Sequence, residues 1–407
     1  MDVVYRRCCG MDIHKDIVVA CCVTGCGKKE VRSFGTMTDD LLGLCGWLKE
    51  NEVEMVAMES TASYWKPIFN LLEIEDIPVI LVNAQHIKNV PGRKTDVKDS
   101  EWIADLLRHG LLRASFVPAR DARELKELVR YRGKVIEERA REYNRMDKVL
   151  QGANIKLSSV ASSMNTVSAM DMCKAISEGQ VTPEILAAMA KGTMKSKTAE
   201  LERALLGFIQ PHQQMILGAM LDHISALDRL IGNLDEEIER RMADVEGIVD
   251  ALDEITGVGK TSAQTIIAEI GTDMSVFPSA KHLVSWAGLC PGKNESAGKK
   301  KKAKTNKGNQ TLKKTVVQCA RSASRAKNTY FNAMYSRIAS RRGAKVACVA
   351  VARTILEVCY HMIKNGECFH ELGADYFIEK NKDDIIKRSI KRIEALGFSV
   401  SVEEKAA

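Results

Sequence analysis

Residues 8–24 read CCGMDIHKDIVVACCVT, which is two apolar runs separated by His14, Lys15 and Asp16. Short apolar runs bounded by polar residues predict β-strands, here at 8–13 and 17–24. A Gly-Cys-Gly turn at 25–27 and a further run at 31–36 predict a third strand. The three strands together predict a meander that begins the fold.

After the meander the sequence alternates between helix-like and strand-like segments. The expected elements are a helix at 41–50, a strand at 53–58, a helix at 64–73, a strand at 78–82 and a helix at 100–109. The order β-β-β-α-β-α-β-α predicts a mixed α/β layer with a hairpin at one edge.

Four carboxylates occupy positions where such a layer brings side chains together. Asp12 closes the first strand and Glu59 follows the strand at 53–58, so both emerge at one edge if these strands are neighbours. Asp96 and Asp99 are three residues apart at the start of a helix, which places them on one face. A single acid at such a position is more often a solvated charge or a helix cap. Four acids held together repel unless cations neutralise them, and Mg²⁺ prefers oxygen ligands. The pattern therefore predicts a site for two Mg²⁺ ions, which can clamp the attacking and leaving oxygens of a phosphodiester.

Positive charge is concentrated in one part of the chain. The 407 residues carry a formal charge of +7, but residues 281–345 hold seventeen Lys or Arg and one acid, so this segment alone is +16 and the remainder is −9. A basic block on an otherwise acidic protein indicates a polyanionic partner. A solvated basic loop is the alternative; it fits residues 299–304 but not the apolar, helix-like sequence after Thr311.

Composition divides the chain into four regions: 1–120, a helical region at 121–245 with an insertion at about 158–198, a helical domain at 246–373, and a charged tail at 374–407. A heptad seam marks the second region, and both an antiparallel hairpin within the chain and pairing with another protomer fit it. The seam consists of Leu217, Met220, Ile224, Leu227, Ile231, Leu234 and Ile238.

Several other classes of protein are disfavoured. The most apolar stretch, 346–363, contains Arg353, Glu357 and His361, which indicates a buried helix rather than a membrane span. The N-terminal residues lack a cleavable signal pattern, so we expect a cytoplasmic chain without a membrane partner. The twelve cysteines include no CxxC pair, which favours small buried side chains over disulfides or zinc ligands.

The segment 255–261 contains Gly259-Lys260-Thr261, which invites comparison with a phosphate-binding P-loop. The first glycine of that motif would fall at Glu254, so the pattern fails. A helix-hairpin-helix fits better, in which Gly257-Val258-Gly259 forms a turn with backbone amides facing a DNA phosphate. A plain turn between two helices is the alternative.

Several of these stretches resemble the DEDD-type insertion-sequence transposases, a family of bridge-RNA-guided recombinases. The matching N-terminal segments are CGMDIHK at 9–15, MEST at 58–61, NAQH at 83–86, GRKTDVKDS at 92–100, and Ile103-Ala104. The resemblance implies a RuvC-like, RNase H-like domain in which Asp12, Glu59, Asp96 and Asp99 bind the catalytic metals.

A second set of matching segments lies near the C-terminus: ITGVGKT at 255–261, WAGLCP at 286–291, ESAG at 295–298 and KGN at 307–309. The resemblance implies that Ser296 is a nucleophile that forms a covalent phosphoserine link to a DNA end. From the residues alone, a serine beside glycine in a basic loop is usually only a loop residue. The expected phosphate-contacting residues are Gly257, Gly259, Lys260, Lys299, Lys300, Lys301, Lys302, Lys304 and Lys307.

The resemblance extends from Cys8 to about Gly373 and also implies partners. These are DNA, a bridge RNA that pairs with donor and target DNA, and further copies of the chain, a tetramer in which acids and serine from different protomers complete one site. Two rival functions remain: a structure-specific nuclease of the junction-resolvase kind, using the same acids with water as nucleophile, and a non-catalytic nucleic-acid-binding scaffold. The segment at 158–198 and the dense lysine run after Gly298 depart from the family pattern.

Overall fold

The computed structural model describes residues 2–60, 63–83, 99–292, 295–296, 299–300 and 305–402. These residues form two compact units, one ending at Arg120 and one beginning at Asp121. The first is a mixed α/β layer and the second is mostly helical, as the sequence predicts.

The N-terminal unit contains the expected order of elements. They are β1 (Cys8–Ile13), β2 (Ile17–Val23), β3 (Lys29–Gly35), α1 (Thr38–Glu50), β4 (Met55–Glu59), α2 (Trp65–Ile74), β5 (Val79–Val82) and α4 (Asp99–Arg108). The sheet order is β3-β2-β1-β4-β5. The meander β1–β3 is antiparallel, whereas β4 and β5 run parallel to β1. This arrangement is consistent with an RNase H-like domain.

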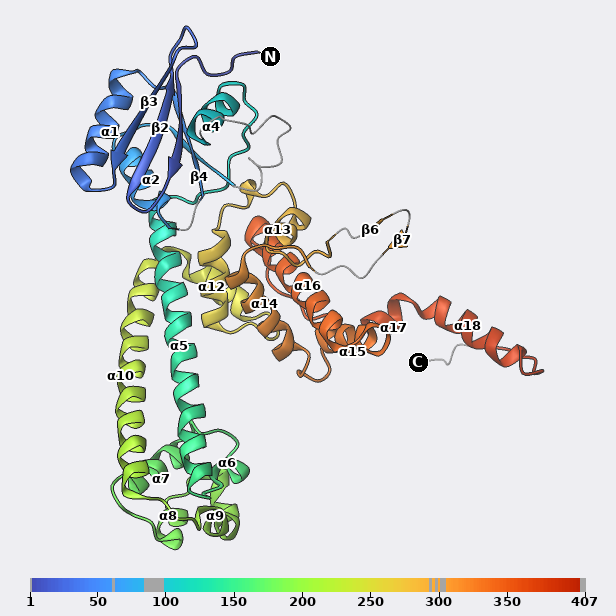
Figure 1. Cartoon of the computed structure of the whole chain (residues 1–407). Helices are drawn as coiled ribbons and strands as arrows, with labels where there is room; N and C mark the ends of the chain where they lie inside the picture. Colours follow the sequence, from blue (N-terminus) through green and yellow to red (C-terminus); the bar gives the residue numbers. More distant parts are fainter. Residues whose placement is uncertain are drawn as a thin grey trace. The chain divides into compact units, whose positions relative to one another are not determined.

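Helices cover both faces of this sheet, as Figure 1 shows. Met11 and Met58 pack with α1 and α2 on one face. Cys8 and Ala57 pack with α4 on the other. Side chains alternate between the two faces along a strand, so every second residue of β1 and β4 faces α4.

Two long helices begin the second unit, α5 (Arg120–Gly152) and α10 (Pro211–Arg241). They lie side by side (Figure 1), and Val135 packs against Leu227, Ile231 and Leu234 of the heptad seam. Polar pairs along the hairpin are Glu124–Arg241, Arg132–Asp235, Arg139–Asp228 and Glu142–His223. Residue numbers rise on one helix as they fall on the other, so the pairing is antiparallel and within one chain.

The segment between these helices forms a helical cap at the far end of the hairpin (Figure 1). Its elements are α6 (Leu157–Val160), α7 (Val167–Ser177), α8 (Pro183–Ala188) and α9 (Thr198–Leu205). The cap has its own apolar core, which includes Met172, Ile176 and Leu201. The sequence marked this part only as an insertion of mixed composition.

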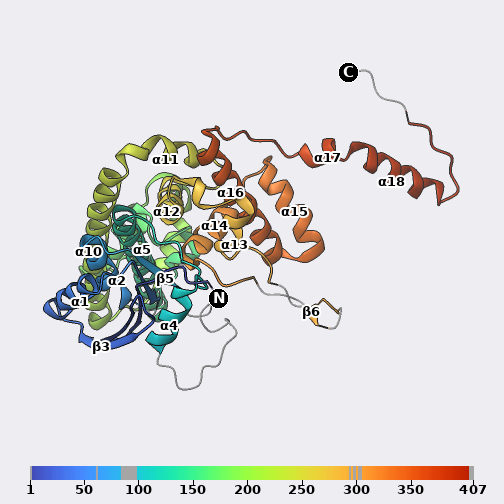
Figure 2. The same ribbon diagram turned by 90° about the horizontal axis from the view of Figure 1, so that it is seen from above.

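The C-terminal part of the unit surrounds one further core. Its helices are α11 (Glu246–Asp253), α12 (Lys260–Ile270), α13 (Ala280–Trp286), α14 (Gln310–Ala323), α15 (Tyr330–Arg342) and α16 (Ala344–Asn365). Figure 2 shows α14, α15 and α16 grouped together. A two-stranded hairpin of β6 (Glu295–Ser296) and β7 (Lys299–Lys300) departs from the expected all-helical domain.

Among the described residues, α16 is the one helix long and apolar enough to cross a membrane. Val351, Ile355 and Cys359 of this helix are fully buried in the core, as expected from the sequence. Such a helix is weak evidence for a membrane span. The tail contains α17 (Tyr376–Lys380) and α18 (Lys382–Glu394), which bury no residue.

Most of the cysteines behave as small apolar side chains. Nine of the twelve are buried and none forms a disulfide. Burial raises the pKa of the Cys8 thiol to about 12, so this group is neutral at ordinary pH. Cys26 and Cys368 are exposed exceptions.

Candidate functional site

Asp12 and Glu59 lie at equivalent positions on two neighbouring parallel strands. The last pair in the register of β1 and β4 is Met11–Met58, and each acid is the next residue along its strand. Because side chains alternate, both acids fall on the sheet face that α4 covers. Both are partly buried. Two carboxylates therefore leave the same edge of the sheet on the same side.

Helix α4 runs antiparallel to β1 and in close contact with it. Cys8 lies beside Ala104, and the amide of Val4 donates to the carbonyl of Arg108 at 2.9 Å. Further along β1, a Cβ added to Gly10 would lie 2.3 Å from the backbone nitrogen of Ala104 and 2.4 Å from the carbonyl oxygen of Ser100. The N-terminal end of α4, which begins at Asp99, thus lies toward the carboxyl end of β1, where Asp12 is.

The chemistry of this donor set suits a hard cation, since its carboxylates supply only oxygen. Among the described residues no group of three or more His, Cys, Asp or Glu is close enough together to hold a metal ion. Asp96, the fourth predicted ligand, lies outside the described residues. The Ser100 hydroxyl beside Asp99 is buried and has no hydrogen-bond partner in the described part of the chain. A buried hydroxyl without a partner is costly, so this position favours a further polar ligand.

Ser296 lies in the β6–β7 hairpin, where its backbone pairs with that of Lys299 and Glu295 pairs with Lys300. We call residues 290–305 the serine arm. Its two ends are held together by a bridge between Pro291 and Thr305 and by a 3.1 Å bond from the amide of Asn306 to the carbonyl of Cys290. The backbone of Ser296 is therefore paired within a short β-hairpin, whereas the sequence indicated a loop.

The turn at 257–259 joins α11 to α12. Gly257 has a φ of +88°, and a Cβ there would lie 2.5 Å from the backbone nitrogen of Ala323, so this glycine packs against α14. The amide of Val258 donates to Ile255 at 2.8 Å. Gly259 and Lys260 are the exposed part of the turn, and Lys260 pairs with Glu239 of α10 at 2.8 Å. A phosphate contact here would involve the first residues of α12.

Three other lysines that were predicted to contact phosphate lie on or beside the serine arm. Lys299 and Lys300 belong to β7, and Lys307 is exposed just after the arm. Lys301, Lys302 and Lys304 lie outside the described residues.

Two residues near the acids were not singled out from the sequence. Gly10 permits the close approach of α4. It lies in the segment CGMDIHK at 9–15, two residues before the predicted ligand Asp12, and this position could have indicated its importance. His14, two residues after Asp12, places Nε2 3.1 Å from Oδ2 of that acid. This contact could not be foreseen, because it depends on how the chain turns after β1.

Comparison with known families finds two matches, one in each half of the chain. Residues 9–155 match the family model for the transposase domain of DEDD type from IS110, and residues 249–336 match the model described as the transposase IS116/IS110/IS902 family. No curated protein matches the chain. The two matches cover more than half of the chain and define an enzyme class, the DNA transposases.

The chain belongs to the IS110 family of DEDD transposases. Membership implies that it acts on DNA and depends on divalent metal ions.

Proposed function

We propose that the chain cuts and rejoins DNA with the four acids as Mg²⁺ ligands and Ser296 as nucleophile. The observation that carries the proposal is the in-register position of Asp12 and Glu59, with the start of α4 directed to the same edge of the sheet. Asp96 and Asp99 complete the ligand set for two ions.

Bound Mg²⁺ ions would polarise the scissile phosphate and stabilise the leaving oxygen. Ser296 loses its hydroxyl proton to solvent, and its Oγ forms a bond to phosphorus. The bond from phosphorus to the leaving DNA oxygen breaks, and that oxygen takes a proton from water. The phosphoserine keeps the phosphodiester energy, so a hydroxyl of another DNA end can displace Ser296 and complete the exchange.

The lysines on and beside the serine arm suit contacts with phosphate rather than with base edges, because ammonium groups are point charges. We therefore propose that sequence recognition comes from a bridge RNA that pairs with donor and target DNA. We further propose a cytoplasmic homotetramer in which one protomer supplies the acids and another the serine.

The nucleophile can be tested with a labelled oligonucleotide that carries the ends of the element. The protein should become covalently attached to DNA in the presence of Mg²⁺, and Ser296→Ala should abolish the attachment. If Ser296→Ala still cuts DNA and the wild type forms no adduct, the enzyme is a nuclease that uses water.

The acids can be tested with Asp12→Asn, which keeps the size of the side chain and removes its charge. We expect cleavage to fall by about 10³-fold or more, since the metal ligand is lost. Unchanged, Mg²⁺-dependent cleavage would contradict the ligand assignment. Sequencing the nucleic acid that co-purifies with the protein tests the guide: one discrete structured RNA supports it, and random fragments contradict it.

A further inference from the structure

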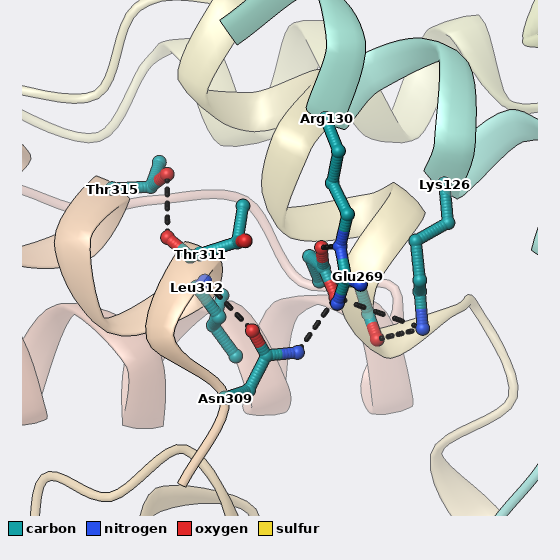
Figure 3. Close-up of polar contacts among 7 residues, drawn as sticks. All are labelled: Lys126, Arg130, Glu269, Asn309, Thr311, Leu312 and Thr315. Atoms are coloured by element: carbon teal, nitrogen blue, oxygen red, sulfur yellow. Dashed lines mark hydrogen bonds and ion pairs between the residues drawn. The ribbon is translucent and has the colours of Figure 1, made fainter. Parts of the chain in front are cut away.

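A buried carboxylate, Glu269, lies at the end of α12 and is bonded by residues from two other helices (Figure 3). Its side chain has no exposed surface. Arg130 of α5 donates Nε to Oε1 at 2.6 Å and Nη2 to Oε2 at 3.0 Å. Lys126, one turn earlier on α5, lies 3.6 Å from Oε2 and donates to the Glu269 carbonyl at 3.2 Å. A buried charge persists only when it is paired in this way.

The remaining bond to this carboxylate comes from Asn309, whose Nδ2 donates to Oε2 at 2.6 Å. The same side chain begins α14, because its Oδ1 accepts the amide of Leu312 at 3.1 Å (Figure 3). Both ends of one amide group are therefore used, one for the helix cap and one for Glu269.

Asn309 also ends the segment that returns from the serine arm. The backbone amide of Asn309 donates to the backbone carbonyl of Trp286 at 3.3 Å. Just before it, a Cβ on Gly308 would lie 2.4 Å from the nitrogen of Gly288, so the outgoing and returning chains touch directly. Lys313 of α14 donates to the hydroxyl of Thr305 at 2.6 Å. The base of the arm is thus fixed to the first turn of α14, and that turn is fixed to Glu269.

The electrostatic environment agrees with a tight network. Burial lowers the pKa of Lys126, and the charge of Glu269 opposes that shift. Glu269 has two cationic partners on α5, Lys126 and Arg130, and one neutral partner, Asn309, toward the serine arm. Replacing the neutral partner alters the connection to the arm and leaves the contacts with α5 in place.

We propose that Glu269 is a positioning residue that acts through Asn309 to hold the base of the serine arm and so to orient Ser296 for attack on phosphorus. The inference rests on the proposed nucleophile. It assigns to a residue outside every predicted site a role in the rate of the covalent step rather than in DNA affinity.

The test inverts one hydrogen bond. Asn309→Asp keeps an oxygen for the cap but sets a second carboxylate against Glu269, and we expect adduct formation to slow by about 10²-fold. Adding Glu269→Gln removes the repulsion between the two carboxylates and lets the introduced amide donate to the introduced carboxylate, but its NH₂ group then also faces Nη2 of Arg130, which donates to Oε2 in the wild type. The double variant should form adducts faster than Asn309→Asp but more slowly than the wild type, since the repulsion is removed while the bond from Arg130 Nη2 is lost. Thr315→Ala is the matched control, because it removes a 3.0 Å bond to Thr311 within the same helix and touches neither partner.

Adduct formation is measured in single turnover, with DNA affinity measured alongside. The proposal is supported if affinity is unchanged, Asn309→Asp is slow, the double variant is faster than Asn309→Asp and the control matches the wild type. It is overturned if Asn309→Asp keeps the wild-type rate, or if the folded double variant remains as slow as the single.

If Asn309→Asp does not fold, Asn309→Ser keeps a capping oxygen but loses the longer side-chain amide that donates to Glu269. Hydrogen exchange of the backbone amides at positions 306 and 309 should then be faster than in the wild type, and unchanged exchange overturns the proposal. Ser296→Ala is measured in parallel. If this variant still forms adducts, Ser296 is not the nucleophile. If it forms none and Asn309→Asp reacts at the wild-type rate, Ser296 remains the nucleophile and only the positioning role of Glu269 is refuted.

Discussion

Replacement of Gly10 by alanine tests whether the packing of α4 on β1 sets the geometry of the acids. A Cβ at this position would lie 2.3–2.9 Å from three backbone atoms of Ser100 and Ala104. Backbone atoms cannot rotate away as a side chain can, so α4 must move by roughly 1 Å to restore ordinary contact. Asp99 at the start of α4 would move relative to Asp12.

The expected magnitudes follow from that displacement. Overpacking of this kind costs about 1–3 kcal/mol, and roughly 4 °C is lost per kcal/mol in a unit of this size. A shift of roughly 1 Å in a catalytic group lowers the rate by about 10²-fold. We therefore expect Gly10→Ala to lower the thermal midpoint modestly and the Mg²⁺-dependent rate strongly.

The assay pairs calorimetry with single-turnover adduct formation. Gly46→Ala in α1 is the control, because nothing lies within 4 Å of the added Cβ and alanine favours a helix. Its rate should match the wild type and its midpoint should be equal or higher. A Gly10→Ala protein with the wild-type rate would show that the position of α4 does not control the acids.

Two further predictions concern stability and thiol reactivity. Arg132→Met should lower the free energy of unfolding by about 1–3 kcal/mol, which would appear as a lower urea midpoint. The buried guanidinium donates to the side-chain oxygen of Gln264 at 2.6 Å, and removing the guanidinium leaves that oxygen without a partner. An unchanged midpoint would show that this hydrogen bond does not stabilise the fold. Iodoacetamide at pH 8 should label Cys26 well before Cys8, and mass spectrometry measures the two rates. The Thr24 hydroxyl lowers the pKa of the exposed Cys26 thiol, whereas burial raises the pKa of the Cys8 thiol to about 12. Equal labelling would contradict this burial.

The N-terminal sheet was predictable because its strands differ in composition from everything around them. The runs at 8–13 and 53–58 are mostly apolar, with Asp12 next to last in the first and Glu59 directly after the second, so periodicity predicted both the strands and the position of these acids. The heptad seam predicted a long helix in the same way. The seam left open whether a helix of the same chain or one of another protomer covers it, because the heptad pattern is the same in both cases.

Other features were not predictable because they depend on contacts far apart in the sequence. The β6–β7 hairpin forms from Glu, Ser and Lys, which have no apolar alternation to indicate a strand. Glu269 lies in a helix that is apolar on several sides, and nothing local shows that an acid there finds Arg130, 139 residues away. Asn309 stood in a recognised motif, but its two bonds become apparent only when α12 and α14 are in place.

The α5–α10 hairpin has a consequence for reach. Its 31-residue second helix is about 46 Å long, and ion pairs to α5 lie along it. The core of the cap reaches Ile224 of α10 and the C-terminal core begins at Ile238, so about 21 Å of helix, comparable to about 6 base pairs of duplex, separates the two cores. A tilt of about 5° at the base moves the tip by about 4 Å. A small change of tilt at one end of α10 therefore displaces the other end by several ångströms.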